Sequence, residues 1–183
     1  MKSLIKIATL LLAVATLATS CKKETPLTID NVAPKITLKL SGGGTEHTFE
    51  TQGTGMSPEG EFFFRENTKY NFTITLSDTS GLGQLRFRIT ESGAVNDFEI
   101  TGSPAATEIA NPDEHEYSII TERTNPYQSF LMTGSFVTGT ELGDSDIELS
   151  IVGRDYLPNT SNLFVNGFVY AQPPIGGFGW YPF

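Results

Sequence analysis

The sequence predicts an all-β domain, an antiparallel β-sandwich of about seven to nine short strands. Three observations lead to this prediction. Apolar and polar residues alternate with a period of two along several segments, turn-forming residues interrupt those segments at short intervals, and no segment after the N-terminal apolar run has a sustained helical period. The composition agrees, because 18 Gly, 10 Pro and 13 Phe suit turns joined by strands.

Four segments alternate most strictly, at 35–40, 70–77, 85–90 and 147–151. Strict alternation marks a strand with one buried face, so every second residue of these segments is expected in the core. The predicted core residues are Ile36, Leu38, Leu40, Tyr70, Phe72, Ile74, Leu76, Leu85, Phe87, Ile89, Ile147, Leu149 and Ile151.

Weaker alternation predicts further strands at 95–101, 116–121, 128–138 and 162–171. Segments carrying Gly, Pro, Asn or Asp separate the strands and are predicted turns; they are 41–47, 78–83, 101–106, 111–116, 123–126, 139–146 and 155–162. Neither an internal repeat nor a second domain is evident, so we expect one domain over 34–172, which is long enough to bury a core without disulfides.

The N-terminus has the layout of a secretory signal. Lys2 and Lys6 precede the uncharged run 7–18, which is shorter than the roughly 20 residues that a spanning helix needs. The following Leu17-Ala18-Thr19-Ser20-Cys21 resembles the lipobox of bacterial lipoproteins. That resemblance implies that residues 1–20 are a cleaved lipoprotein signal peptide and that acyl chains are attached to Cys21. The alternative is an ordinary signal peptide cut after Ser20 or Ala15.

The resemblance also implies a location. More than one acyl chain anchors a protein stably, so an acylated Cys21 would hold the chain on a membrane. The Cys-Lys-Lys-Glu at 21–24 is similar to lipoproteins of Bacteroidota, and Lys22 stands where an inner-membrane retention signal would have Asp. We therefore expect an outer-membrane lipoprotein, facing either the periplasm or the cell surface. The polar residues 21–33 are then the lipidated Cys and a tether.

Charge and motifs exclude several classes of function. The formal net charge of −9 makes nucleic acid an improbable partner, because phosphate binding needs a basic surface. The sequence contains no Gly-x-Ser-x-Gly, no Gly-x-x-x-x-Gly-Lys and no Cys-x-x-Cys. Its two histidines, His47 and His115, lie in predicted loops and are too few for a zinc site. No cofactor or metal is predicted.

Two acidic groups and one arginine pair are further candidate sites in the sequence. The acidic groups Asp113, Glu114, Glu116 and Asp144, Asp146, Glu148 lack the ligand spacing of a calcium loop and are interpreted as solvated. Arg86 and Arg88 share one face of a predicted strand, where we expect a solvated surface opposite acidic neighbours.

Three stretches resemble bacterial immunoglobulin-like domains: 30–38, 71–89 and 144–162. In the second and third, a strand ends in an Asp that precedes a turn. The resemblance implies an immunoglobulin-like sandwich in which Asp78 and Asp155 cap turns through bonds to backbone N–H groups. Together with the lipobox, the layout is similar to small Bacteroidota lipoproteins with a single immunoglobulin-like domain.

The C-terminal segment 173–183, PPIGGFGWYPF, is aromatic where flexible tails are usually polar. One interpretation is that it folds back and covers the open end or an edge of the sandwich. The other is that Phe178, Trp180, Tyr181 and Phe183 form a binding platform for a glycan or a protein.

The sequence as a whole favours a non-catalytic module, bound to the membrane through Cys21, that binds a glycan or an envelope protein. The alternative is a structural, adhesion or scaffold domain without a small ligand. A glycan-active enzyme is the least favoured class, because two catalytic carboxylates cannot be singled out among 21 acidic residues.

Overall fold

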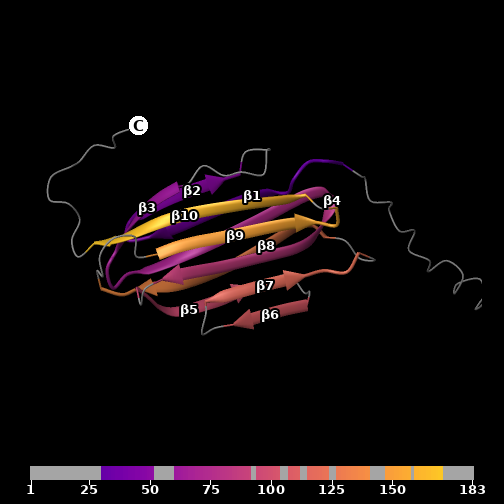
Figure 1. The fold of residues 1–183 in the computed structure, drawn as a ribbon. Coiled ribbons are helices and arrows are strands. Elements are labelled where there is room, and N and C mark those ends of the chain that lie inside the picture. Colours follow the sequence, from indigo (N-terminus) through magenta and orange to yellow (C-terminus); the bar gives the residue numbers. More distant parts are fainter. Residues whose placement is uncertain are drawn as a thin grey trace, which may run out of the picture.

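The computed structural model describes residues 30–51, 60–91, 94–103, 107–111, 115–123, 127–140, 147–157 and 159–170 (Figure 1). These residues form strands joined by turns, and no helix occurs among them, which confirms the all-β prediction. The strands are β1 (Lys35–Gly42), β2 (Thr45–Glu50), β3 (Gly60–Arg65), β4 (Lys69–Glu91), β5 (Val95–Gly102), β6 (Thr107–Asn111), β7 (Glu116–Ile120), β8 (Tyr127–Thr138), β9 (Ile147–Asp155) and β10 (Thr160–Tyr170).

The long strand β4 belongs to both layers of a sandwich. Its first part pairs with β1 and β8, its second part pairs with β7 and β9, and the register shifts between Ser77 and Leu82. The rings of Phe72 and Phe87 lie 4.8 Å apart, whereas a straight strand would separate them by about 50 Å. The chain therefore reverses direction between the two parts, at the segment 78–83 that was predicted as a turn, although β4 continues through it from Lys69 to Glu91.

Two packed layers follow from the pairings. The first layer has the order β2-β1-β4-β8-β5, and the second has the order β3-β10-β9-β4-β7-β6. The chain crosses between layers repeatedly, as in immunoglobulin-like sandwiches. Every pairing is antiparallel except that of β3 with β10, which is parallel. The expectation of a purely antiparallel sandwich was therefore wrong for this pair. The chain passes from β2 in the first layer to β3 at the edge of the second layer, where β3 runs in the same direction as β10.

Three strands were not predicted from the sequence: β2, β3 and β6. The predicted turn at 41–47 reduces to Gly43 and Gly44, whose φ angles of +58° and +82° suit a two-residue hairpin. His47 therefore lies on β2 and not in a loop, whereas His115 does lie in a turn. The other predicted turns fall at the joints between successive strands.

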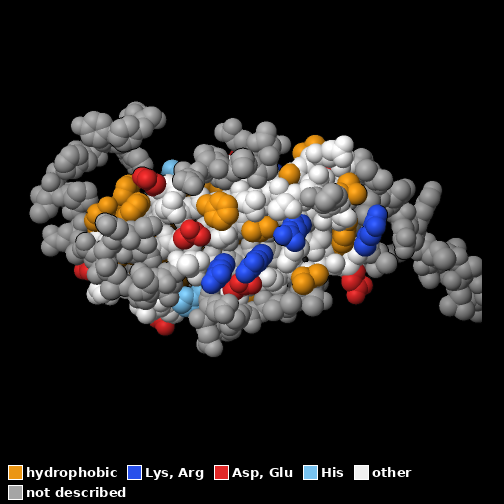
Figure 2. Space-filling view, in the orientation of Figure 1, with side chains coloured by type: hydrophobic (Ala, Val, Ile, Leu, Met, Phe, Trp, Pro, Cys, Tyr) orange, Lys and Arg blue, Asp and Glu red, His pale blue; other side chains and the backbone are white. Residues whose placement is uncertain are grey.

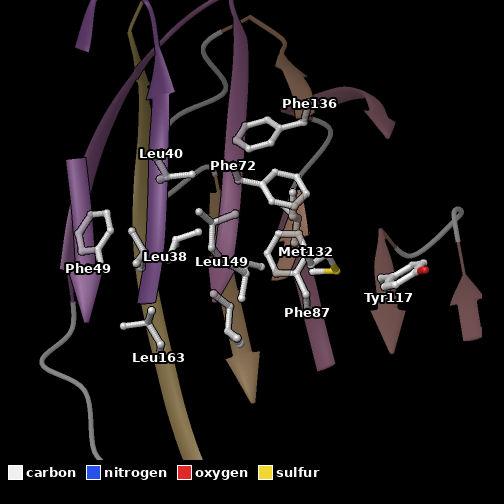
Figure 3. Packing of buried hydrophobic residues seen from close by; sticks show 14 of the residues in the cluster. Leu38, Leu40, Phe49, Phe72, Phe87, Tyr117, Met132, Phe136, Leu149 and Leu163 are labelled. Carbon is white, nitrogen blue, oxygen red and sulfur yellow. The ribbon is translucent and has the colours of Figure 1, made fainter. Parts of the chain in front are cut away.

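The core lies between the two layers. All 13 predicted core residues are buried, with at most 2% of each side chain's surface exposed. Figure 3 shows Phe72, Phe87 and Met132 close together at its centre. A second group of rings packs beside it, where Phe64 of the second layer lies 4.8 Å from Tyr70 and 5.6 Å from Phe136 of the first. The buried rings fix which side chains of each strand face outward.

Candidate functional site

The outer face of the second layer carries an unusual set of side chains for this acidic chain. The alternation that buries Phe87 and Leu149 turns Arg86 and Arg88 outward. Register then places Arg88 opposite Ser150 of β9, and Ser150 opposite Phe164 of β10. We call this surface the arginine–aromatic face; its residues include Glu61, Phe63, Arg65, Arg86, Arg88, Glu116, Ile120, Glu148, Ser150, Val152, Arg154, Phe164, Phe168 and Tyr170.

One end of this face is aromatic. The rings of Phe63 and Phe168 stack at 5.7 Å, and the ring of Tyr170 lies 5.5 Å from that of Phe63. Phe63 is 55% exposed and Tyr170 is 41% exposed, although both are large and apolar. We call Phe63, Phe168 and Tyr170 the aromatic end. Figure 2 shows hydrophobic side chains gathered at the end of the face where β10 finishes.

Exposed apolar side chains concentrate on this face. Of the six large hydrophobic side chains that are exposed in the described residues, four belong to it: Phe63, Ile120, Phe164 and Tyr170. Scattered exposed apolar residues are normal on any protein, but a contiguous group of them marks an interaction surface. The distribution therefore singles out the second layer.

The middle of the face is rich in arginine (Figure 2). The guanidinium of Arg86 donates two hydrogen bonds to the Glu116 carboxylate, at 3.0 and 2.7 Å, and these bonds hold the pKa of Glu116 below its usual value. Glu116 is the register partner of Arg88, whose charge also lowers the pKa of Glu116, but the hydrogen bonds to the Glu116 carboxylate come from Arg86. None of the ion pairs among the described residues involves Arg88 or Arg154, and the buried Nε of Arg88 has no hydrogen-bond partner.

This arrangement can bind a carboxylate. A guanidinium presents parallel N–H donors that match the two oxygens of a carboxylate. Arg88 provides such donors within one strand spacing of Ser150, a small residue that leaves room above the sheet. The exposed ring of Phe164 lies on the far side of Ser150. A cation and an aromatic ring therefore flank a shallow stretch of sheet.

The outer face of the first layer differs. It is rich in hydroxyl groups, including Thr37, Thr73 and Thr75. Lys35 and Lys39 of this face are paired with Glu50 and Glu46, each at 2.9 Å. Leu131 of β8 stands out as its exposed large hydrophobic side chain, at 57%. This face therefore provides matched control positions for experiments on the other one.

A second cluster lies at the turns that join strands at one end of the sandwich. Carboxylate oxygens of Asp30, Asp78 and Asp155 lie within 4.8 Å of one another. Asp78 accepts a hydrogen bond from the Ser80 backbone N–H at 2.7 Å. Asp155 accepts one from the Asn159 backbone N–H at 3.2 Å and one from its side-chain amide at 2.7 Å. Each of the two carboxylates thus accepts a hydrogen bond from a backbone N–H a few residues further along the chain.

The three side chains of this cluster are all acidic, so their negative charges repel one another. Burial raises the pKa of Asp78, and the neighbouring Asp30 and Asp155 charges add to the rise, while the hydrogen bonds from Ser80 work against it. A hydrogen bond from the Thr79 hydroxyl lowers the pKa of Asp30. Three carboxylates at this separation offer the oxygen ligands that calcium prefers. The three carboxylates already accept hydrogen bonds from hydroxyl, amide and backbone groups, so these bonds explain their positions without a bound ion.

Several residues that the sequence singled out lie outside the described residues: Cys21, Asp113, Glu114, Asp144, Asp146, Phe178, Trp180, Tyr181 and Phe183. Arg86 has the acidic neighbour expected of it, since it pairs with Glu116. That pairing ties Glu116 to Arg86 and not to a calcium site. Glu148 lies on the arginine–aromatic face, as its expected solvated strand position implies.

The aromatic end was not predicted from the sequence. Its signal was present in β3, where GEFFFR holds three consecutive Phe residues, so a two-sided strand must expose at least one ring. Phe62 and Phe64 are buried and Phe63 is the exposed one. Its contact with Phe168 depends on a pairing between strands about a hundred residues apart, which no local pattern reveals.

Within the described part of the chain, no helix is long and apolar enough to cross a membrane.

Comparison with known proteins gives structural likeness only. No protein family and no curated protein matches the sequence. Among solved structures, a non-cellulosomal cohesin from the archaeon Archaeoglobus fulgidus is similar at a TM-score of 0.36 and 5% identity, covering 63% of this chain and 88% of the cohesin.

The sixth cohesin of Acetivibrio cellulolyticus scaffoldin B, solved in complex with a Cel5 dockerin mutant, is similar at a TM-score of 0.33 and 16% identity. That match covers 62% of this chain and 94% of the cohesin. At these scores neither likeness defines the fold or the function of the chain, which rest on its own strand pairings and surface.

Proposed function

We propose that the protein is a non-catalytic binding module, held at the outer membrane by lipid on Cys21, that binds an acidic protein segment through its arginine–aromatic face. The observation that carries the proposal is Arg88, a guanidinium without an ion-pair partner in the described residues, placed across Ser150 from the exposed ring of Phe164.

Residue types support a protein partner. Binding hot spots are enriched in aromatic residues and arginine, and both are gathered on this face. Arg65, Arg88 and Arg154 lack ion pairs in the described residues, so each can take a carboxylate from a partner. In a chain of net charge −9, a surface with four arginines attracts a partner that the rest of the molecule repels.

Membrane attachment rests on the sequence. The lipobox-like residues 17–21 support acylation of Cys21, and Lys22 favours the outer membrane. The segment 21–33 would then join the lipid to β1, which begins at Lys35. A tether of about a dozen polar residues would leave the sandwich free to meet partners near the membrane surface.

Charge reversal tests the proposed function. Intact envelopes carrying Arg88→Glu or Arg154→Glu are treated with a chemical cross-linker, and the covalent adducts of the protein are compared with wild type. We expect both variants to lose a protein adduct that Lys69→Glu retains, because Lys69 is an exposed cation on the opposite face and has no ion-pair partner among the described residues. Melting curves confirm that each variant is folded.

Three results would refute the proposed function. An adduct that survives both arginine reversals would place the partner elsewhere. An adduct that is lost equally in Lys69→Glu would indicate general electrostatics and no defined face. If the adduct proves to be a glycan or a lipid, the face binds a different class of partner from the one proposed.

A further inference from the structure

We infer that residues 171–183 of this chain pack over the aromatic end, so that Phe63, Phe168 and Tyr170 form the seat of the C-terminal aromatic segment. This goes beyond the proposed function, which rests on Arg88 and the exposed ring of Phe164, whereas the inference concerns Phe63, Phe168 and Tyr170 at one end of the face. Either can fail while the other holds.

The first support is the aromatic end itself. Phe63 exposes 55% of its side-chain surface although its ring stacks on Phe168 and touches Tyr170. Proteins seldom leave a contiguous group of large rings in water without an occupant. The three rings come from two neighbouring strands in register, so they form a preformed platform rather than scattered side chains.

The second support is continuity. Residue 171 follows directly on Tyr170, which is itself one of the three rings. Thirteen residues can span at most about 43–47 Å. The platform spans only two residues of β10, from Phe168 to Tyr170, or roughly 7 Å. The segment is thus several times longer than the distance it has to cover, and Pro173, Pro174, Gly176 and Gly177 suit a reversal of direction.

The third support is chemistry. Residues 171–183 contain no charged side chain and hold four aromatic residues, Phe178, Trp180, Tyr181 and Phe183. Aromatic rings pair favourably in stacked or edge-to-face arrangements, which the existing Phe63–Phe168 stack can extend.

Two other occupants are less suited to the platform. A second copy would have to find it from solution, whereas a short tethered segment is present at a millimolar effective concentration. An anionic membrane surface would meet Glu61 as well as Arg65 beside Phe63 on β3, in a chain of net charge −9, so charge gives it no net attraction to the platform. The chain's own segment therefore has the advantage.

Trp180 is the only Trp in the chain, so its fluorescence reports on this segment without any label. In the full chain purified in detergent, we expect blue-shifted emission and weak quenching by iodide. In the double variant Phe63→Ala, Phe168→Ala, the emission should shift to the red and the quenching constant should rise several-fold. Leu131→Ala, an equally exposed apolar position on the opposite layer, should leave both unchanged.

Each alternative gives a different result, and each would overturn the inference. A wild-type Trp180 that is fully quenched by iodide would mean that the segment is unpacked. Protection that persists in the double variant would place the segment elsewhere. Protection that is lost on dilution would indicate a second copy, and quenching by brominated detergent would indicate the micelle. Circular dichroism of the double variant checks that the sandwich is intact, as expected for an exposed ring pair.

Discussion

Truncation of Phe87 to alanine should remove the ring that joins the two layers. Phe87 is completely buried, and its ring lies 4.8 Å from Phe72 of the opposite layer and 6.1 Å from Phe98 of β5. Neighbours on both sides are held by strand pairing, so the space cannot collapse around a smaller side chain. The substitution therefore leaves a cavity in addition to the lost apolar burial.

The magnitude follows from these contacts. Phe→Ala substitutions in cores cost about 3–5 kcal/mol, and the lost ring pairs place Phe87 toward the upper part of that range. For a domain of this size, each kcal/mol lowers the melting temperature by about 2–4 °C. The expected decrease is therefore on the order of 6–20 °C.

Urea unfolding followed by circular dichroism measures the free energy of unfolding directly. Leu131→Ala is the matched control, because Leu131 is 57% exposed and its truncation should change the stability by less than about 0.5 kcal/mol. A decrease in the free energy of unfolding below about 1 kcal/mol for Phe87→Ala would refute the two-layer packing, because removing a ring that is buried between two sheets costs more than that. A helical spectrum would refute the fold class.

Three further predictions concern other parts of the chain. Gly134→Ala should destabilise the protein by about 1–3 kcal/mol in the same urea assay, because a Cβ there would lie 2.3 Å from the Phe72 ring and 2.4 Å from a backbone carbonyl; unchanged stability would contradict this close approach. The raised pKa of Asp78 means that its contribution to stability is fully present below the unfolded pKa near 3.8 and is lost as the pH rises through the folded pKa. Asp78→Asn keeps the acceptor for Ser80, so this variant should melt at or above the wild-type temperature at neutral pH, and the difference should shrink in acid. Asp78→Ala loses the acceptor and should lower the free energy of unfolding by about 1 kcal/mol. A large loss of stability in Asp78→Asn would show that the charge itself is needed. Cys21→Ala should abolish metabolic labelling with palmitate and move the protein out of the detergent phase, and retained labelling would exclude the lipoprotein interpretation.

The strands of the core were predictable because each has one buried face. In 35–40, 70–77 and 85–90, which belong to β1 and to the two parts of β4, apolar and polar residues alternate and burial follows the pattern. The alternation is hidden in β3, where Phe62, Phe63 and Phe64 are equally apolar although only Phe63 is exposed. The length of the turn before β2 was overestimated, because three consecutive glycines suggested a long turn, whereas Gly43 and Gly44 alone form it.

The candidate site was predictable only in part. Arg86 and Arg88 could be predicted to share an outer face, because residues two apart in one strand point to the same side of the sheet. The remaining neighbours depend on pairing between distant strands. Phe63 meets Phe168 through the parallel pairing of β3 with β10, and Asp30 meets Asp78 and Asp155 at the turns of different strands. Contacts of this kind follow from topology, which local sequence patterns do not specify.

Site-specific photo-cross-linking tests the central claim most directly, that the arginine–aromatic face is where a partner binds. A photoreactive phenylalanine analogue replaces Phe164 in one strain and Leu131 in another, and intact cells are irradiated. Both positions expose a large apolar side chain, but they lie on opposite layers. We expect a discrete protein adduct from position 164 that disappears when Arg88→Glu is added, and none from position 131. Equal adducts from the two positions, or an adduct from position 131 alone, would contradict it.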